Sequence, residues 1–126
     1  MTRINVVDPE ELCDQHLLAE LRELPRIPNA IIKGRVSFDK PLPESYRMGP
    51  GHVRFFYDKI PWLYMRYTAL WHEAGRRGFK VSWRFPEMRV YTDPEPWYPN
   101  SEDRAVNLAR ILQTYKRFKP RWTETN

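Results

Sequence analysis

Hydrophobic side chains recur at the spacing of an α-helix in three parts of the chain. The first part, residues 8–24, opens with Asp8 and Pro9, which suit the cap and the first turn of a helix. Pro25 and Pro28 then predict a kink or an end of this helix. Its expected core face consists of Cys13, Leu17, Leu21 and Leu24.

Two further helices are predicted over residues 61–77 and 101–118. Gly78 suits the C-terminal stop of the former, while acidic residues begin the latter and basic residues end it, as the helix dipole favours. The buried stripe expected for 61–77 is Leu63, Tyr67, Leu70, Trp71 and Ala74. The stripe expected for 101–118 is Ala105, Leu108, Ile111, Leu112 and Tyr115.

The stretches between these helices are rich in proline and glycine, which predicts long ordered loops. Residues 79–83 alternate as a short extended piece would, but no convincing partner strand is present. We therefore expect an all-α fold in which residues 1–126 form a single compact domain of three helices.

Charge and composition narrow the possible partners. Lys and Arg number 21 against 16 Asp and Glu, a net charge of +5 that suits a polyanion such as nucleic acid. The chain has no apolar run of signal-peptide or membrane-span length, and Cys13 is its only cysteine, so we expect an intracellular, cytoplasmic protein without a membrane partner. Cys13 and the three histidines lack metal-ligand spacing, so neither a metal nor another cofactor is expected.

The polar face of the first helix is the first candidate working surface. Gln15, His16, Arg22, Glu23 and Arg26 project within a sector of about 120° on a helix of 3.6 residues per turn. Such a face is also common on a helix that simply faces solvent. Arginine and histidine, however, suit contacts to phosphates or base edges, and a lone carboxylate among them could be held for chemistry.

The N-terminus supplies a candidate nucleophile. A small residue such as Thr2 favours removal of Met1, which would leave Thr2 with a free α-amine. With a reference pKa of about 7.7–8.0, such an amine is far less protonated near neutral pH than a lysine. Together with the Glu23 carboxylate and the arginines, this amine suggests Schiff-base chemistry on a nucleic-acid sugar.

Several short segments closely resemble the phage pyrimidine-dimer DNA glycosylase/AP-lyase family known as endonuclease V. They read MTRIN (1–5), DQHL (14–17), AE (19–20), RELPR (22–26), GHV (51–53), FFYDK (55–59) and RGF (77–79). The resemblance implies an all-α domain of three helices with the N-terminal segment packed between them. It also implies damaged double-stranded DNA as the partner, and we expect a monomer.

The resemblance further implies a mechanism. The Thr2 amine would attack the sugar C1′ of an ultraviolet-induced cyclobutane pyrimidine dimer to form an imine. Glu23 would handle protons there and in the β-elimination that cuts the strand. The family's DNA-contact residues are matched by Arg3, Gln15, His16, Arg22 and Arg26.

The C-terminal segment departs from the family's aromatic C-terminal segment, because residues 115–126 read YKRFKPRWTETN. Phe118 and Trp122 could replace its stacking groups, or they could form a helix end that packs on the core. Two alternatives to the dimer-specific enzyme therefore stay open. One is a related enzyme for abasic sites or other base lesions, and the other is a non-catalytic module that binds damaged DNA.

Overall fold

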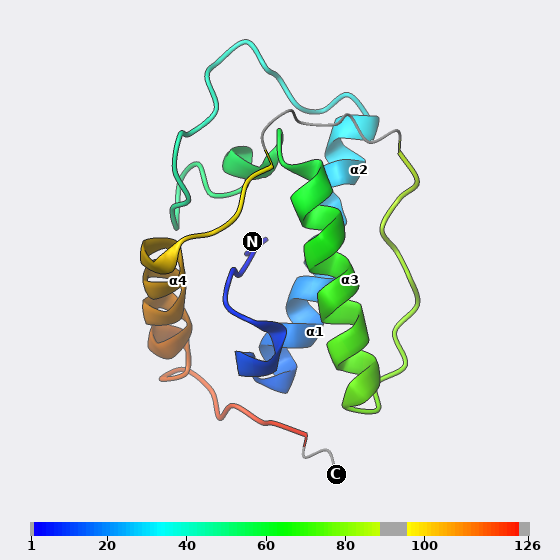
Figure 1. Cartoon of the computed structure of the whole chain (residues 1–126), viewed down its shortest axis with the longest axis vertical. Coiled ribbons are helices and arrows are strands. Elements are labelled where there is room, and N and C mark those ends of the chain that lie inside the picture. Colours follow the sequence, from blue (N-terminus) through cyan, green and yellow to red (C-terminus); the bar gives the residue numbers. More distant parts are fainter. Residues whose placement is uncertain (1, 89–95, 124–126) are drawn as a thin grey trace.

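The computed structural model describes residues 2–88 and 96–123, and within these ranges it contains helices and loops but no β-strand. The elements, in chain order, are η1 (Pro9–Glu11), α1 (Asp14–Glu23), α2 (Arg26–Ile32), η2 (Arg54–Phe56), α3 (Ile60–Arg76) and α4 (Ser101–Thr114). The all-α prediction is confirmed (Figure 1). The short helix α2 is an addition to the three helices predicted.

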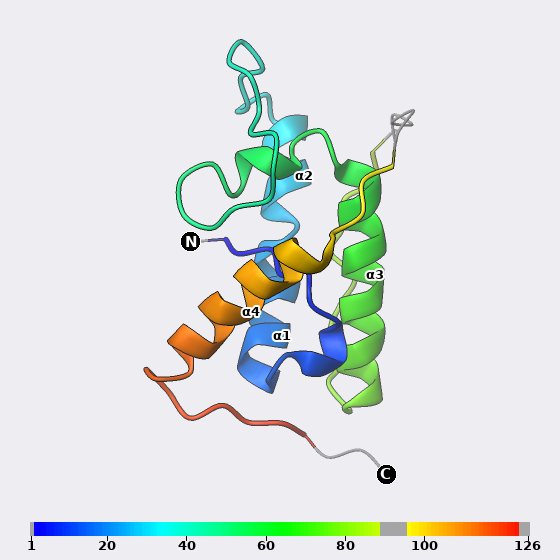
Figure 2. The same cartoon turned by 60° about the vertical axis from the view of Figure 1, so that its left-hand side comes forward.

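The N-terminal segment runs through the middle of the molecule, between α4 on one side and α1 with α3 on the other (Figures 1 and 2). Four successive residues of this segment are buried, namely Ile4, Asn5, Val6 and Val7. The placement of this segment between helices, which the family resemblance implied, is therefore confirmed.

The first predicted helix is divided. Asp8 and Glu11 do form a capping box, but it starts only the single turn η1. Arg77 then donates to the backbone carbonyls of Pro9 and Glu10, at 3.2 and 3.3 Å, which are the acceptors that a continuing helix would use. The chain becomes extended at Leu12, and α1 begins at Asp14.

Helix α2 follows α1 almost directly and contains Pro28. Pro28 is the third residue of α2, where a backbone N–H would have no partner within the helix, so proline does no harm there. The predicted core face of the first helix is confirmed, because all four of its residues are buried: Cys13, Leu17, Leu21 and Leu24.

Helix α3 presents its predicted face to the core. Leu63, Tyr67, Leu70 and Ala74 are each fully buried. Trp71 lies at the edge of this face, partly buried, and its indole N–H donates to the Val81 carbonyl at 2.7 Å. That bond ties the loop after α3 to the helix, so the alternating residues 79–83 lie along α3 without forming a strand.

The predicted stripe of α4 is wrong for three of its five residues, whereas Ile111 is buried and Tyr115 is partly buried, as predicted. Ala105, Leu108 and Leu112 are exposed, and Leu112 keeps 53% of its surface. The face turned inward instead carries the fully buried Asn107, with Ile111 one turn later. The helix also ends at Thr114 rather than at residue 118.

Asn107 explains why a polar residue faces inward. Its side-chain carbonyl accepts the backbone N–H groups of Val6 and Val7, at 2.7 and 3.2 Å, and its amide donates to the Asn5 side chain at 2.8 Å. A buried extended segment without a partner strand must find acceptors for its N–H groups elsewhere. This requirement, rather than apolar periodicity, sets the rotation of α4.

Candidate active site

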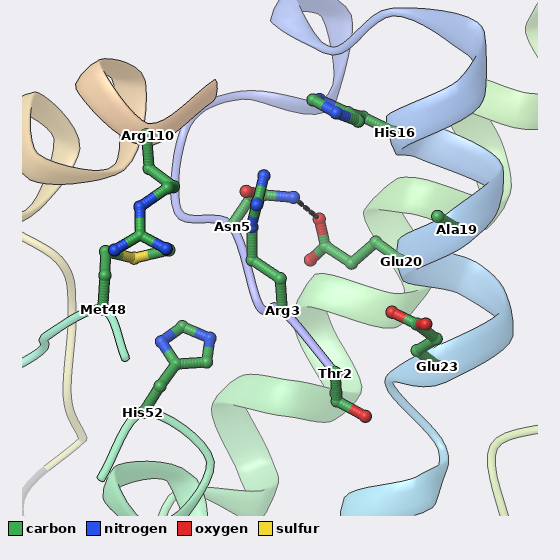
Figure 3. Close-up of a pocket in the computed structure, with 10 residues that line it drawn as sticks. All are labelled: Thr2, Arg3, Asn5, His16, Ala19, Glu20, Glu23, Met48, His52 and Arg110. Atoms are coloured by element: carbon green, nitrogen blue, oxygen red, sulfur yellow. Dashed lines mark hydrogen bonds between the residues drawn. The ribbon is translucent and has the colours of Figure 1, made fainter. Parts of the chain in front are cut away.

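A pocket opens where the N-terminal segment meets α1, α4 and the loop before η2 (Figure 3). Helix α1 and the N-terminal segment supply most of its wall, Arg110 comes from α4, and the loop supplies two residues. The lining residues are Thr2, Arg3, Asn5, His16, Ala19, Glu20, Glu23, Met48, His52 and Arg110. The pocket thus combines residues from both ends of the sequence.

A buried ion pair joins Glu20, which lines the pocket, to Arg66 behind it, which is not a lining residue. Arg66 on α3 donates to both carboxylate oxygens of Glu20, at 2.8 and 3.0 Å, and also to the Val7 carbonyl. The Asn5 amide donates to the same carboxylate at 2.8 Å. Because all the bonds described for Glu20 lie in this network, its carboxylate holds the N-terminal segment in place.

Glu23, one turn further along α1, is in a different situation. Its side chain keeps 17% of its surface exposed, and its ion-pair partner Arg26 is 3.8 Å away and itself 60% exposed. Figure 3 shows its carboxylate pointing from α1 toward the N-terminal segment that carries Thr2. Of the two pocket carboxylates, Glu23 is therefore the more exposed and the more loosely paired.

The opposite wall of the pocket is positively charged. Burial and the neighbouring Arg110 guanidinium lower the pKa of Arg3. Burial, assisted by Arg3, likewise lowers the pKa of His16, so this ring is neutral near pH 7. Two guanidinium groups that repel each other in a half-buried pocket favour an anion between them, such as a phosphate.

The sequence-predicted site residues fall into two groups. Thr2, Arg3, His16 and Glu23 line the pocket together. The other three lie outside it: Gln15 and Arg22 on α1, and Arg26 at the start of α2.

Arg22 and Arg26 are both exposed, at the end of α1 and the start of α2, and Arg26 forms the ion pair with Glu23. Gln15 instead holds the C-terminal segment, because its amide donates to the Lys119 carbonyl at 2.9 Å and its oxygen accepts the Arg121 N–H at 3.0 Å. For all seven residues, the functional roles stay predictions.

The C-terminal segment continues from α4 and crosses the start of α1 (Figure 2). The His16 ring packs against Tyr115 and Phe118, with ring centroids 5.2 and 5.3 Å apart. Trp122 meets the edge of Tyr115 and remains half exposed. Phe118 therefore packs on a pocket residue, whereas Trp122 keeps an open surface.

Sequence reasoning missed Arg110, Met48 and His52. Arg110 was missed because the face of α4 was assigned from its apolar residues, and Arg110 lies on the opposite, inward side with Asn107. His52 did carry a signal, since it lies within the Gly-His-Val match to the family, but that match alone assigns the histidine no role. No signal in the sequence points to Met48.

Two general features accompany this site. Within residues 2–88 and 96–123, no three or more His, Cys, Asp or Glu side chains gather in a way that could hold a metal ion. No helix in the described part of the chain is long and apolar enough to cross a membrane.

Comparison with protein families bears directly on this geometry. The family model for pyrimidine dimer DNA glycosylase matches residues 1–86, which is 86 of the 126 residues. The matched part contains nine of the ten pocket residues, all except Arg110. The chain therefore belongs to the pyrimidine dimer DNA glycosylase family, and it is a DNA repair glycosylase that acts on pyrimidine dimers.

Proposed function

We propose that this glycosylase also cuts the DNA strand, as an AP lyase, by way of a covalent imine on the α-amine of Thr2. The observation that carries the proposal is the shared position of Thr2, Glu23 and Arg3 in one pocket. An amine nucleophile, a carboxylate and a guanidinium are the three groups that this chemistry needs. The proposal requires removal of Met1, because a peptide bond would occupy the nitrogen of Thr2.

The first stage replaces one bond at C1′ by another. The neutral Thr2 amine donates its electron pair to C1′, and the bond from C1′ to the pyrimidine breaks. The departing base takes the bonding pair and a proton. Glu23 takes one proton from the amine and passes it to the departing base; the ring oxygen then leaves C1′ with the bonding pair and takes a proton from water, which leaves a protonated imine between Thr2 and C1′.

The second stage cuts the strand. The protonated imine withdraws electrons, so a base can remove a proton from C2′, and the phosphate on C3′ then leaves with its electron pair. Water finally hydrolyses the imine and restores the amine. Glu23 suits the proton transfers of both stages, because its carboxylate is less buried than Glu20 and faces the N-terminal segment.

The cationic residues account for DNA binding in this proposal. Arg3 lies inside the pocket beside Arg110, where the pair would hold a phosphate next to the reacting sugar. Arg22 on α1 and Arg26 at the start of α2, both exposed, would hold phosphates further along the strand. His16 and Gln15 complete the proposed contacts, Gln15 from the rim formed with the C-terminal segment.

Borohydride trapping tests the proposal. Duplex DNA with one defined cyclobutane dimer is incubated with the enzyme and sodium borohydride, which reduces an imine to a stable bond. We expect a covalent adduct whose DNA is attached at Thr2, and no adduct after acetylation of the N-terminus or in Glu23→Gln. The matched control is Glu87→Gln, which neutralises an exposed carboxylate outside the pocket.

The same assay on an abasic duplex separates the alternatives. A wild-type adduct on the abasic duplex with none on the dimer would favour a relative tuned to abasic sites. Tight binding of both duplexes without an adduct on either would refute the lyase mechanism, and so would undiminished incision after the N-terminus is blocked.

A further inference from the structure

We infer that His52 is a positioning residue for the reaction, which holds the N-terminal segment so that the Thr2 amine points at the sugar. The inference rests on the proposed function, in which that amine is the nucleophile. His52 comes from the loop before η2, and its side chain lies on the opposite wall of the pocket from α1 (Figure 3). It is 48 residues away from the backbone that it holds.

Both ring nitrogens of His52 are engaged with backbone. Nε2 accepts the backbone N–H of Ile4 at 2.8 Å, and Nδ1 lies 2.7 Å from the Arg47 carbonyl oxygen. A carbonyl oxygen has no hydrogen to give, so Nδ1 must carry the proton and donate it. These two bonds assign one tautomer of the neutral ring, because a doubly protonated ring would have no lone pair for Ile4.

Ile4 is the point at which the segment is fixed nearest to Thr2. Its N–H is bound by His52, and its carbonyl accepts the Tyr46 hydroxyl at 2.9 Å. Among the described residues, Ile4 is the first along the chain whose backbone N–H and C=O groups both have a hydrogen-bond partner. The direction of the two residues before it, including the proposed nucleophile, depends on this clamp.

Burial and the surrounding charges together lower the pKa of His52, which favours the neutral ring at neutral pH. Burial is the main cause that lowers the pKa of His52, and the guanidinium groups of Arg3 and Arg110 act in the same direction. The bond to Arg47 and the more distant Glu20 carboxylate act against it without reversing the direction. The acceptor for Ile4 is therefore intact at neutral pH.

Three variants of His52 remove its hydrogen bonds to Ile4 and Arg47 in different combinations. The side chain of Gln reaches as far as Nε2, so His52→Gln can still accept from Ile4. The side chain of Asn reaches only as far as Nδ1, so His52→Asn keeps a partner for Arg47 and loses Ile4. His52→Phe keeps the ring packing against Tyr46 and loses both bonds.

The measurement is the single-turnover rate of borohydride trapping on an abasic duplex at saturating enzyme. A second measurement gives the affinity for a duplex with a tetrahydrofuran abasic analogue, which cannot form an imine. We expect His52→Asn and His52→Phe to trap about 10- to 100-fold more slowly, the range that a misplacement near 1 Å produces. We expect His52→Gln to stay within about three-fold of wild type, which is under 1 kcal/mol in the barrier, and all affinities to change little.

Two further measurements distinguish positioning from general damage. Trp71→Phe removes one side-chain bond to a loop carbonyl far from the pocket, and it should trap at the wild-type rate despite a similar loss in Tm. The amide proton resonance of Ile4 reports the clamp without any chemistry, and it should move in His52→Phe and less in His52→Gln.

The outcomes are separable. If wild type forms no adduct, the proposed function fails, and the Ile4 resonance still tests the clamp. If wild type forms the adduct and His52→Phe traps equally fast, the inference is wrong while the proposed function stands. Equal slowing in all three His52 variants and in Trp71→Phe would also overturn it, because the effect would then follow stability alone.

Discussion

The ion pair between Glu20 and Arg66 gives the sharpest test of how the fold holds its site. Side chains of this pair are only 1% and 5% exposed, and Arg66 makes two bonds to the carboxylate. Arg66→Met keeps the apolar volume of the side chain and removes the positive charge. Glu20 would then be a buried carboxylate whose remaining described bond comes from Asn5.

The expected cost follows from that loss. Breaking a buried pair by removing one partner costs about 3–5 kcal/mol, because the other charge is left uncompensated. The Val7 carbonyl also loses its donor, which adds to the cost. Against a total stability of about 5–15 kcal/mol for a domain, Arg66→Met should still fold but be strongly weakened.

Urea unfolding at pH 7.5 measures the effect, with Glu20→Gln and the double variant completing a cycle. Since the pair is buried, the double variant should cost about 1–3 kcal/mol less than the sum of the two single variants. Asp58→Asn is the surface control, because Asp58 is 55% exposed in its pair with Lys59 and should lose under about 1 kcal/mol. The reasoning is refuted if Arg66→Met costs no more than Asp58→Asn, or if the single costs simply add.

Three other predictions follow from local features. Burial lowers the pKa of His52 below its ordinary value of 6.5, so on acidification the unfolded chain takes up this proton before the folded chain does. The free energy of unfolding should therefore fall as the pH drops below about 6.5, and it should fall less in His52→Gln; urea titrations at pH 7.5 and 5.5 measure this. Gly75→Ala places its new methyl group in open space on α3 and should raise the stability by about 0.5–1 kcal/mol. Gly51 has a φ of +86°, and a new Cβ there would lie 3.1 Å from a proline carbon, so Gly51→Ala should lower the stability by about 1–2 kcal/mol or more. Thermal unfolding of the two variants measures both effects. Gln15→Ala removes two bonds to residues 119–121 and should cost about 1–2 kcal/mol, with faster tryptic cleavage of that segment than in wild type.

The sequence predicted best those features that depend on neighbours along the chain. The core face of α3 was correct because its apolar residues pack against α1, so that helical spacing and burial agree. Their chemistry and the family resemblance link Thr2 with Glu23 in the sequence, and both residues line the same pocket.

Features that depend on distant residues were predicted poorly. The break between η1 and α1 follows partly from Arg77, whose side chain reaches the Pro9 carbonyl from 68 positions away. The local sequence there, with its acidic cap and proline, has every signal of a longer helix. The Arg77 side chain, at the end of α3, thus competes for the carbonyls that a longer helix would need. No residue within 8–24 indicates this competition.

Helix α4 shows the same physics in its strongest form and explains why part of the site was missed. Its apolar residues Leu108 and Leu112 predict burial, yet both face solvent, because the buried segment beside the helix carries N–H groups that need an acceptor in addition to its apolar side chains. The cost of leaving those buried groups unsatisfied, about 1–3 kcal/mol each, rivals the gain from burying a leucine. Two such groups are satisfied by the one oxygen of Asn107, so the polar face turns inward and brings Arg110 into the pocket with it. Threading the N-terminus through the core therefore determines both the rotation of α4 and the charge that faces the proposed nucleophile.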